Sequence, residues 1–366
     1  MRDLRGEQLK VPKFKHSIVD SFKEVLSAVG LENGKIVPGE FDKCIFFIVD
    51  GFGHQLMNSF GILDNLGMET HEIGSVLPSM TATCLSSIFS GVRPAEHGVL
   101  GARFYLPEAG NWIKPLSFTT VDNKPVSIKS PDLLLTNKLW DVMSDSSIGV
   151  RAIKPAHVGK TFSKAFFPDE IIELVKGSEG FDTALKKFLN SEDSIAIPYW
   201  ENPDLLLHWG HSIDEVKENL REIFGAISAL STEKNADKTC LIIMGDHGMT
   251  KLNNKIDFKE IDHLWDGVPE GKSRQRMAFT KDANAVAEAL PGVHVLNSKN
   301  ALDSGLFGKP HERVSERMGD LILFAKEKNA MLYDGPDHVY AHGSLNEEEL
   351  STSFAFCRLS DFKPSI

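Results

Sequence analysis

Candidate metal ligands follow separate apolar runs of this sequence. They are three aspartates and three histidines: Asp50, Asp204, His208, Asp246, His247 and His342. Aspartate and histidine side chains bind divalent metal ions, and two sites of three ligands each leave room for water, a substrate or a hydroxyl group. The residue types therefore predict a centre with two metal ions.

Each of these residues also has a structural interpretation. Asp50 and Asp246 could cap the turns that follow their strands. Asp204 and His208 lie four residues apart, so on one helical turn they could form only a local pair. A loop histidine is the ordinary interpretation of His342. The joint presence of all six residues at the ends of apolar runs favours the metal centre.

The hydroxyl-rich segment "LPSMTATCLSS" (77–87) supplies candidate nucleophiles. A hydroxyl group is a poor nucleophile at neutral pH, but a divalent cation stabilises its ionised form. Residues 81–91 predict a helix closed by Gly91, whose N-terminus would add positive partial charge. The candidates are Ser79, Thr81, Thr83, Ser86 and Ser87, and nothing within the segment chooses among them.

Alternating apolar segments indicate the elements that would position these groups. Buried strands are expected at 44–50, 147–153, 193–200 and 240–248, and amphipathic helices at 181–190 and 212–230. This alternation is typical of an α/β domain, whose ligand sites lie beyond the carboxyl ends of the strands.

Two stretches differ from this core in composition. Residues 102–137 form a long excursion, and residues 251–316 form a smaller inserted lobe, which leaves 1–250 and 317–366 as the catalytic core. We expect the chain to return to the core through a strand at 319–326. A helix beginning near Asn346 is expected at its end.

Composition excludes several classes of function. The net charge of -11 argues against a groove for a nucleic-acid polymer. No apolar run is long enough to span a membrane, and the charged N-terminal segment lacks a secretory signal. Four separated cysteines predict free thiols and a cytoplasmic location. The oligomeric state has no signature in the sequence.

The order of several motifs resembles the alkaline phosphatase superfamily, and most closely its type I phosphodiesterase/nucleotide pyrophosphatase family. These motifs are "IVDGFG", "MTATCLSSIFSGVRPAEHGVLG", "PDLLLHWG", "MGDHGM" and "AHGSLNEEE". The resemblance extends from Phe41 onward. It implies a three-layer α/β/α sandwich with a mostly parallel central sheet and a metal-dependent hydrolase of phosphate esters.

The resemblance also implies roles for individual residues. A threonine ten residues before the helix-ending Gly91 is the nucleophile, which selects Thr81 and leaves Thr83 as the alternative. One metal site would use Asp204, His208 and His342, with His211 as an alternative to His208. The other would use Asp50, Asp246, His247 and the Thr81 hydroxyl. The two ions would be zinc, with manganese or iron as alternatives.

The expected reaction is double displacement through a covalent phosphothreonine. The backbone N–H of Ala82 and the Arg103 side chain are expected to bind the substrate, a small phosphorylated compound such as a nucleotide. Arg274 and Arg276 would either contribute to this binding or be exposed charges of the lobe. The alternatives are a phosphomonoesterase, a phosphonate hydrolase or a phosphomutase at the same site, or a metal-binding protein without activity.

Overall fold

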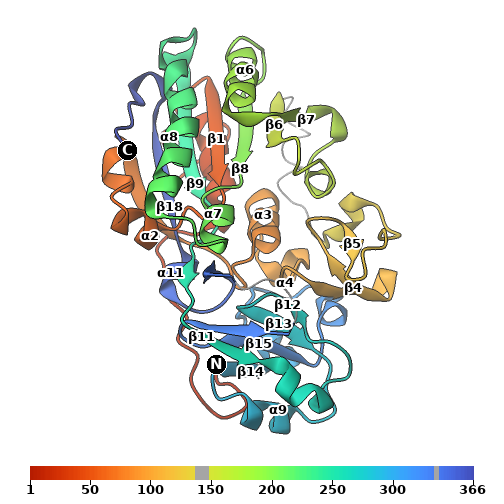
Figure 1. The fold of residues 1–366 in the computed structure, drawn as a ribbon. Helices are drawn as coiled ribbons and strands as arrows, with labels where there is room; N and C mark the ends of the chain where they lie inside the picture. Colours follow the sequence, from red (N-terminus) through yellow and green to blue (C-terminus); the bar gives the residue numbers. More distant parts are fainter. Residues whose placement is uncertain (137–147, 334–337) are drawn as a thin grey trace.

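A seven-stranded sheet forms the larger part of the molecule in the computed structural model, which describes residues 1–136, 148–333 and 338–366 (Figure 1). Residue 137, the last of the expected excursion, lies outside these ranges. Residue 147, the first of an expected strand, also lies outside them. In spatial order the strands are β2 (Glu69–Gly74), β18 (Ser351–Arg358), β9 (Thr239–Gly245), β1 (Lys43–Val49), β8 (Ile195–Trp200), β6 (Val150–Pro155) and β7 (Ile172–Val175).

This sheet is mostly parallel, as predicted. Strands β2, β9, β1, β8, β6 and β7 run in one direction, and β18, which lies between β2 and β9, is antiparallel to both. Every residue of β1 is buried, since alternate side chains enter two different cores. A continuous apolar run such as "CIFFIV" is typical of a strand that is covered on both faces.

Helices cover both faces of the sheet and give the predicted three layers. Helices α1 (Ser21–Ala28) and α3 (Thr81–Ser90) pack on one face. Helices α2 (His54–Ser59), α6 (Gly177–Leu189) and α8 (Ile213–Ala229) pack on the other. Ser212 begins α8 through a capping box with Glu215. Gly91 ends α3 with φ 68°, a conformation that glycine adopts without strain.

A second, antiparallel sheet of four strands lies below the first in Figure 1. Its order is β12 (Glu270–Gly271), β13 (Gln275–Ala278), β15 (Leu321–Ala325) and β14 (Val293–Asn297), with helices α9 (Ala283–Ala289) and α10 (Ser298–Asp303). The expectation that 319–326 returns to the core was wrong, because β15 pairs with β13 and β14. An apolar run in the sequence indicates that a strand is buried, but it does not indicate which sheet the strand joins.

The N-terminal residues belong spatially to this lobe, although we expected residues 1–250 to lie in the core. The Leu4 amide donates to the Val295 carbonyl at 2.9 Å, and the Arg5 guanidinium donates to the Leu290 carbonyl at 2.7 Å. The N-terminus accordingly lies beside β14 in Figure 1. Charged residues that bind carbonyls on a distant segment leave no periodic signal in the sequence.

Shorter elements complete the fold. Within the excursion, β3 (Phe104–Leu106), β4 (Asn111–Lys114) and β5 (Thr119–Thr120) form a small sheet after helix α4 (Pro94–His97). Two strand pairs join the larger and smaller parts: β10 (Thr250–Lys251) with β17 (Tyr340–Ala341), and β11 (Asn254–Asp257) with β16 (Asn329–Leu332).

The end of the chain differs from the prediction. Asn346 does cap a helix, but α11 (Glu347–Leu350) has only four residues, and the chain then enters strand β18. In the described part of the chain, no helix is long and apolar enough to cross a membrane.

Candidate active site

The carboxyl ends of three neighbouring parallel strands bring most of the candidate ligands together. Asp50 follows β1, and Asp246 and His247 follow β9. Asp204 begins the short helix α7 (Asp204–His208), which follows β8. His342 follows β17, whose pairing with β10 returns the chain to the end of β9. Tertiary structure thus gathers residues from four distant segments.

Thr81 lies in the first of two clusters at this edge. Its Oγ1 is 3.2 Å from Nε2 of His247, and it is the first residue of α3. The same Nε2 lies 3.3 Å from Oδ1 of Asp50 and 3.4 Å from Oδ2 of Asp246. The hydroxyl therefore contacts an imidazole that itself lies beside two carboxylates, at a helix N-terminus where partial positive charge favours an anion.

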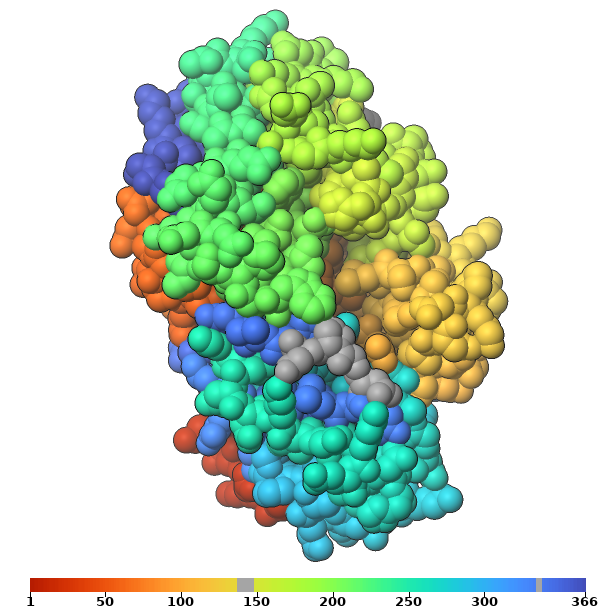
Figure 2. All heavy atoms as spheres, in the orientation of Figure 1, coloured from red at the N-terminus to blue at the C-terminus, as the bar shows by residue number. Residues whose placement is uncertain are grey.

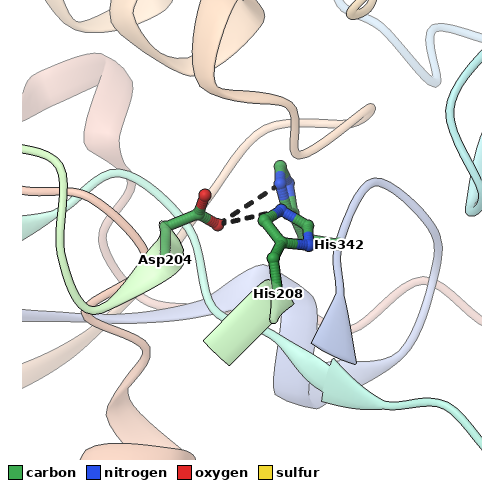
Figure 3. Close-up of side chains that lie close together, drawn as sticks. All are labelled: Asp204, His208 and His342. Atoms are coloured by element: carbon green, nitrogen blue, oxygen red, sulfur yellow. Dashed lines mark ion pairs between the residues drawn. The ribbon is translucent and has the colours of Figure 1, made fainter. Parts of the chain in front are cut away.

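Asp204, His208 and His342 form the second cluster (Figure 3). Oδ1 of Asp204 is 3.4 Å from Nε2 of His208 and 3.5 Å from Nε2 of His342. The two clusters adjoin, because the rings of His247 and His342 stack with their centroids 3.7 Å apart. The arrangement offers two neighbouring sets of ligand atoms.

Backbone carbonyl groups orient all three histidines in the same way. The contacts are His208 Nδ1 to Tyr340 O (2.7 Å), His342 Nδ1 to Ser79 O (2.6 Å) and His247 Nδ1 to Gly248 O (3.1 Å). A carbonyl oxygen only accepts hydrogen bonds, so each Nδ1 carries the proton. Each Nε2 then keeps a lone pair directed into the clusters, which is the tautomer that binds a metal ion.

The carboxylates also fit bound cations. One oxygen of each aspartate is buried and accepts no hydrogen bond from any described residue: Asp50 Oδ1, Asp204 Oδ1 and Asp246 Oδ2. Buried carboxylate oxygens normally have a partner, since an unpaired one is strongly destabilising. Divalent cations between these oxygens and the histidine Nε2 atoms would supply that partner.

The shifted pKa values of the clustered residues also fit the binding of cations. Burial, together with the charges of Asp246 and Asp204, raises the pKa of Asp50 well above its ordinary value. Burial is also the main cause of the raised pKa values of Asp204 and Asp246. Burial and the neighbouring histidines hold the pKa of His342 well below its ordinary value. Neutral histidines and crowded carboxylates are suited to cation binding.

Neighbouring groups hold two of the carboxylates in place. The Tyr199 hydroxyl donates a short hydrogen bond to Oδ2 of Asp50. Oδ1 of Asp246 accepts from the amides of Gly51 (3.1 Å) and His247 (3.0 Å). Each carboxylate therefore uses one oxygen within the protein and directs the other into the cluster.

Other hydroxyl groups of the 77–87 segment have different surroundings. Ser79 Oγ accepts from the Gly343 amide, and Ser86 Oγ donates to the Ala82 carbonyl. Ser87 Oγ contacts His97, and Thr83 is buried without a partner among the described residues. His211 pairs with Glu215 at 3.0 Å and is not part of either cluster. Among the five hydroxyls, Thr81 alone is in contact with a ligand candidate.

A pocket of about 340 Å³ opens over the second cluster and Thr81. Five of the candidate site residues line it: Thr81, Ala82, Asp204, His208 and His342. Figure 2 shows the surface hollowed beside α7, between the green atoms and the orange atoms of the residues after α3. Sequence analysis missed several lining residues, which come from α7, the excursion, the lobe and the segment before β17: Leu116, Leu205, Trp209, Lys272, Ser273 and His338.

The three candidate arginines have other neighbours. Arg103 donates to Glu270 at 2.7 Å, and it is not among the residues that line the pocket. Arg274 is fully buried against Glu349, with Nε 3.1 Å from Oε1. Arg276 is also buried and donates to the Pro269 carbonyl at 2.7 Å. The alternative that Arg274 and Arg276 are exposed charges was wrong, because both are buried, and neither lines the pocket.

Comparison with known proteins identifies a matching family and structures with a similar fold. Residues 44–345 match the family described as type I phosphodiesterase / nucleotide pyrophosphatase. Murine ectonucleotide pyrophosphatase/phosphodiesterase 5 has a similar structure, with 16% identity, a TM-score of 0.68 and coverage of 86% of this chain and 87% of that chain. An inactive variant of the murine protein in complex with AMP is similar with a TM-score of 0.66, 15% identity and coverage of 86% and 87%.

A second type of enzyme has the same fold. Phosphonoacetate hydrolase from Sinorhizobium meliloti, in complex with phosphonoformate, has 16% identity, a TM-score of 0.63 and coverage of 88% of this chain and 92% of that chain. Comparison with curated protein sequences finds no match. Identities this low show the fold, so specificity must be argued from the pocket.

Proposed function

Because this chain belongs to the type I phosphodiesterase/nucleotide pyrophosphatase family and is therefore a phosphoric ester hydrolase, we propose that it cleaves phosphodiesters or nucleotide pyrophosphates with Thr81 as nucleophile. One observation carries this assignment. The Thr81 hydroxyl lies 3.2 Å from His247 Nε2 at the N-terminus of α3, beside carboxylate oxygens that lack a partner among the described residues.

The two clusters would hold two divalent cations. We assign Asp50, Asp246, His247 and the Thr81 hydroxyl to one, and Asp204, His208 and His342 to the other. Aspartate and histidine ligands suit zinc, with manganese and iron as alternatives. When bound, such ions lower the pKa of a coordinated hydroxyl group and neutralise charge on phosphoryl oxygens.

The proposed reaction has two displacements at phosphorus. The Thr81 hydroxyl loses its proton to solvent, its Oγ1 bonds to phosphorus, and the bond from phosphorus to the leaving oxygen breaks. A water molecule then attacks the phosphothreonine ester, the bond from phosphorus to Oγ1 breaks, and Thr81 regains a proton. The Ala82 amide would hold a phosphoryl oxygen throughout, a role supported by its position as the second residue of α3 and by its place in the pocket lining.

Hydrolysis of two chromogenic substrates tests this proposal. Chelator-treated protein, with zinc or manganese added back, is expected to cleave thymidine p-nitrophenyl phosphodiester faster than p-nitrophenyl phosphate. Thr81→Ala should lower this activity by more than about a thousandfold. Faster cleavage of the monoester would contradict the assignment as a phosphodiesterase and favour a phosphomonoesterase. Activity of Thr81→Ala equal to that of wild type would show that Thr81 is not the nucleophile.

Phosphonate hydrolysis is a second candidate, because a phosphonoacetate hydrolase shares the fold over 88% of this chain. Release of inorganic phosphate from phosphonoacetate by the metal-loaded protein would support it. A rate exceeding that of the phosphodiester would make phosphonate hydrolysis the better assignment.

A further inference from the structure

A lysine of the smaller lobe forms part of the pocket wall. Lys272 follows β12, and its side chain lines the pocket together with Asp204, His208 and His342. The Lys272 backbone N–H donates to the Gln275 carbonyl at 2.8 Å, which closes the turn between β12 and β13. Within the described residues no carboxylate forms an ion pair with its ammonium group. This cation is therefore available to a ligand.

Further positive charges surround Lys272. Desolvation by the pocket wall, followed by the charges of Arg103 and Arg276, lowers its pKa, and Lys114 acts in the same direction. Arg103 is paired with Glu270, but the region remains cationic in a chain whose net charge is -11. A local concentration of positive charge on an acidic protein favours a negatively charged ligand at this wall.

The position of Lys272 relative to Thr81 identifies which part of the substrate it would meet. In-line displacement places the leaving group opposite the nucleophile. Thr81 lies in the cluster of Asp50, Asp246 and His247, whereas Lys272 lines the pocket together with all three residues of the other cluster. The Lys272 side of the pocket therefore receives the leaving group.

The pocket also carries apolar surface. Trp209 is 55% exposed, and Leu205 and Leu116 are 45% and 48% exposed, although all three line the pocket. The ring of His338 lies 4.4 Å from that of His208, and its buried Nδ1 has no hydrogen-bond partner among the described residues. An apolar or aromatic group would cover these side chains and an adjacent anion would reach the lysine.

We propose that this pocket selects leaving groups in which an apolar or aromatic body carries a second anionic group, a phosphate or a carboxylate, and that Lys272 binds that group. This inference rests on the proposed function, because the leaving-group side is defined by Thr81 as the nucleophile.

Two substrates with the same aryl groups test the proposal. Bis(p-nitrophenyl) phosphate releases p-nitrophenol, which has no further anionic group, whereas the symmetrical bis(p-nitrophenyl) pyrophosphate releases p-nitrophenyl phosphate. Lys272→Gln should lower the ratio of kcat/KM for the pyrophosphate to that for the diester by about tenfold, since a charge-assisted contact is lost. Lys272→Arg should keep most of the ratio.

Lys299→Gln, an exposed lysine of α10, is the matched control, and both of its kcat/KM values should stay within about twofold of wild type. A Lys272→Gln ratio within about twofold of wild type would exclude a phosphate-bearing leaving group at Lys272. Failure of the wild-type protein to cleave either substrate would instead contradict the proposed function.

Binding tests the lysine independently of turnover. Phosphonoacetate and methylphosphonate differ by one carboxylate, and the metal-loaded protein can be titrated with each by calorimetry. A preference for phosphonoacetate that Lys272→Gln reduces about tenfold would support the anionic subsite, and an unchanged preference would exclude a carboxylate-bearing leaving group. Exclusion of both kinds of leaving group would overturn the inference. An effect on the pyrophosphate alone identifies a phosphate-bearing leaving group, and an effect on phosphonoacetate alone identifies a carboxylate-bearing one.

Discussion

Oγ1 of Thr81 lies 3.2 Å from Nε2 of His247, although 166 residues separate the two in the chain. Thr83, two residues later on the same helix, has a buried hydroxyl without a partner among the described residues. Both threonines belong to α3, so the helix alone does not distinguish them. Contact with His247 does.

Exchanging each threonine separately tests this distinction. Thr81→Ala is expected to lower hydrolysis by more than about a thousandfold, because the attacking oxygen is removed. Thr83→Val replaces the threonine by a residue of similar volume and removes a hydroxyl group that has no partner among the described residues. Activity should therefore persist. The free energy of unfolding should stay within about 1 kcal/mol of wild type or increase. Steady-state kinetics and urea denaturation measure both effects. Loss of turnover in Thr83→Val with turnover retained in Thr81→Ala would reverse the assignment.

Removal of the metal ions should affect stability more at high pH than at low pH. Burial raises the pKa values of Asp50, Asp204 and Asp246, so the metal-free folded protein holds protons that the unfolded chain has lost. Its stability falls as the pH rises through these raised values, whereas cation binding requires the ionised carboxylates. The increase in Tm on adding zinc should therefore be larger at about pH 8 than at about pH 5.5.

Differential scanning calorimetry with and without zinc measures this increase, and Asp193→Asn provides a control carboxylate outside the active site. Asp193 pairs with Arg151 at 2.7 Å and belongs to none of the candidate metal clusters, so its substitution should leave the pH dependence of the zinc effect in place. An increase in Tm that is equal at both pH values would contradict the assignment of the three active-site aspartates as ligands.

Tyr199 is expected to position a metal ligand. Its hydroxyl donates to Oδ2 of Asp50, which leaves Oδ1 directed towards His247. Tyr199→Phe should weaken metal binding by about tenfold to a hundredfold, since partners of ligating carboxylates fix their orientation. Competition with a chromogenic chelator measures the affinity. Tyr105→Phe, on β3 of the excursion, is the control, and equal affinities of the two variants would exclude this role for Tyr199.

The buried ion pair between Arg274 and Glu349 should be important for stability. Both side chains are fully buried, and Oε2 of Glu349 also accepts from the Ser344 amide at 2.8 Å, two residues beyond His342. Arg274→Met would leave the Glu349 carboxylate buried without its cation, at an expected loss of about 3–5 kcal/mol in the free energy of unfolding.

Arg313→Met is the matched comparison, because Arg313 forms an exposed ion pair with Glu108. Its expected loss is less than about 1 kcal/mol. Urea denaturation of both variants measures the difference. Similar losses in the free energy of unfolding would show that burial does not make the Arg274 pair more important for stability than the exposed pair.

Residue types and local order carried much of the information needed to predict this site. Asp50, Asp204 and Asp246 each lie just beyond an apolar run, and such runs become parallel strands whose carboxyl ends meet at one edge. The structure brings these residues together with Thr81, His208, His247 and His342. Their roles as nucleophile and ligands stay predictions until metal content and turnover are measured.

Other features depended on contacts that no local pattern records. The run "LILFA" predicts a buried strand, but its place in the smaller sheet follows from pairing with β13 and β14. Arg274 and Arg276 have the composition of surface charges, and only the packing of the lobe buries them. Lys272 and His338 reach the pocket because the lobe faces the edge of the larger sheet.

The sequence by itself determined the α/β class, the family and the chemical inventory of the site, because strand burial and motif order are local properties of the chain. Tertiary structure decided which hydroxyl contacts His247, which arginines are buried and which lysine lines the pocket. The contact between Thr81 and His247 joins segments 166 residues apart, and the contact between Arg274 and Glu349 joins segments 75 residues apart, so the packing of the folded chain sets these distances.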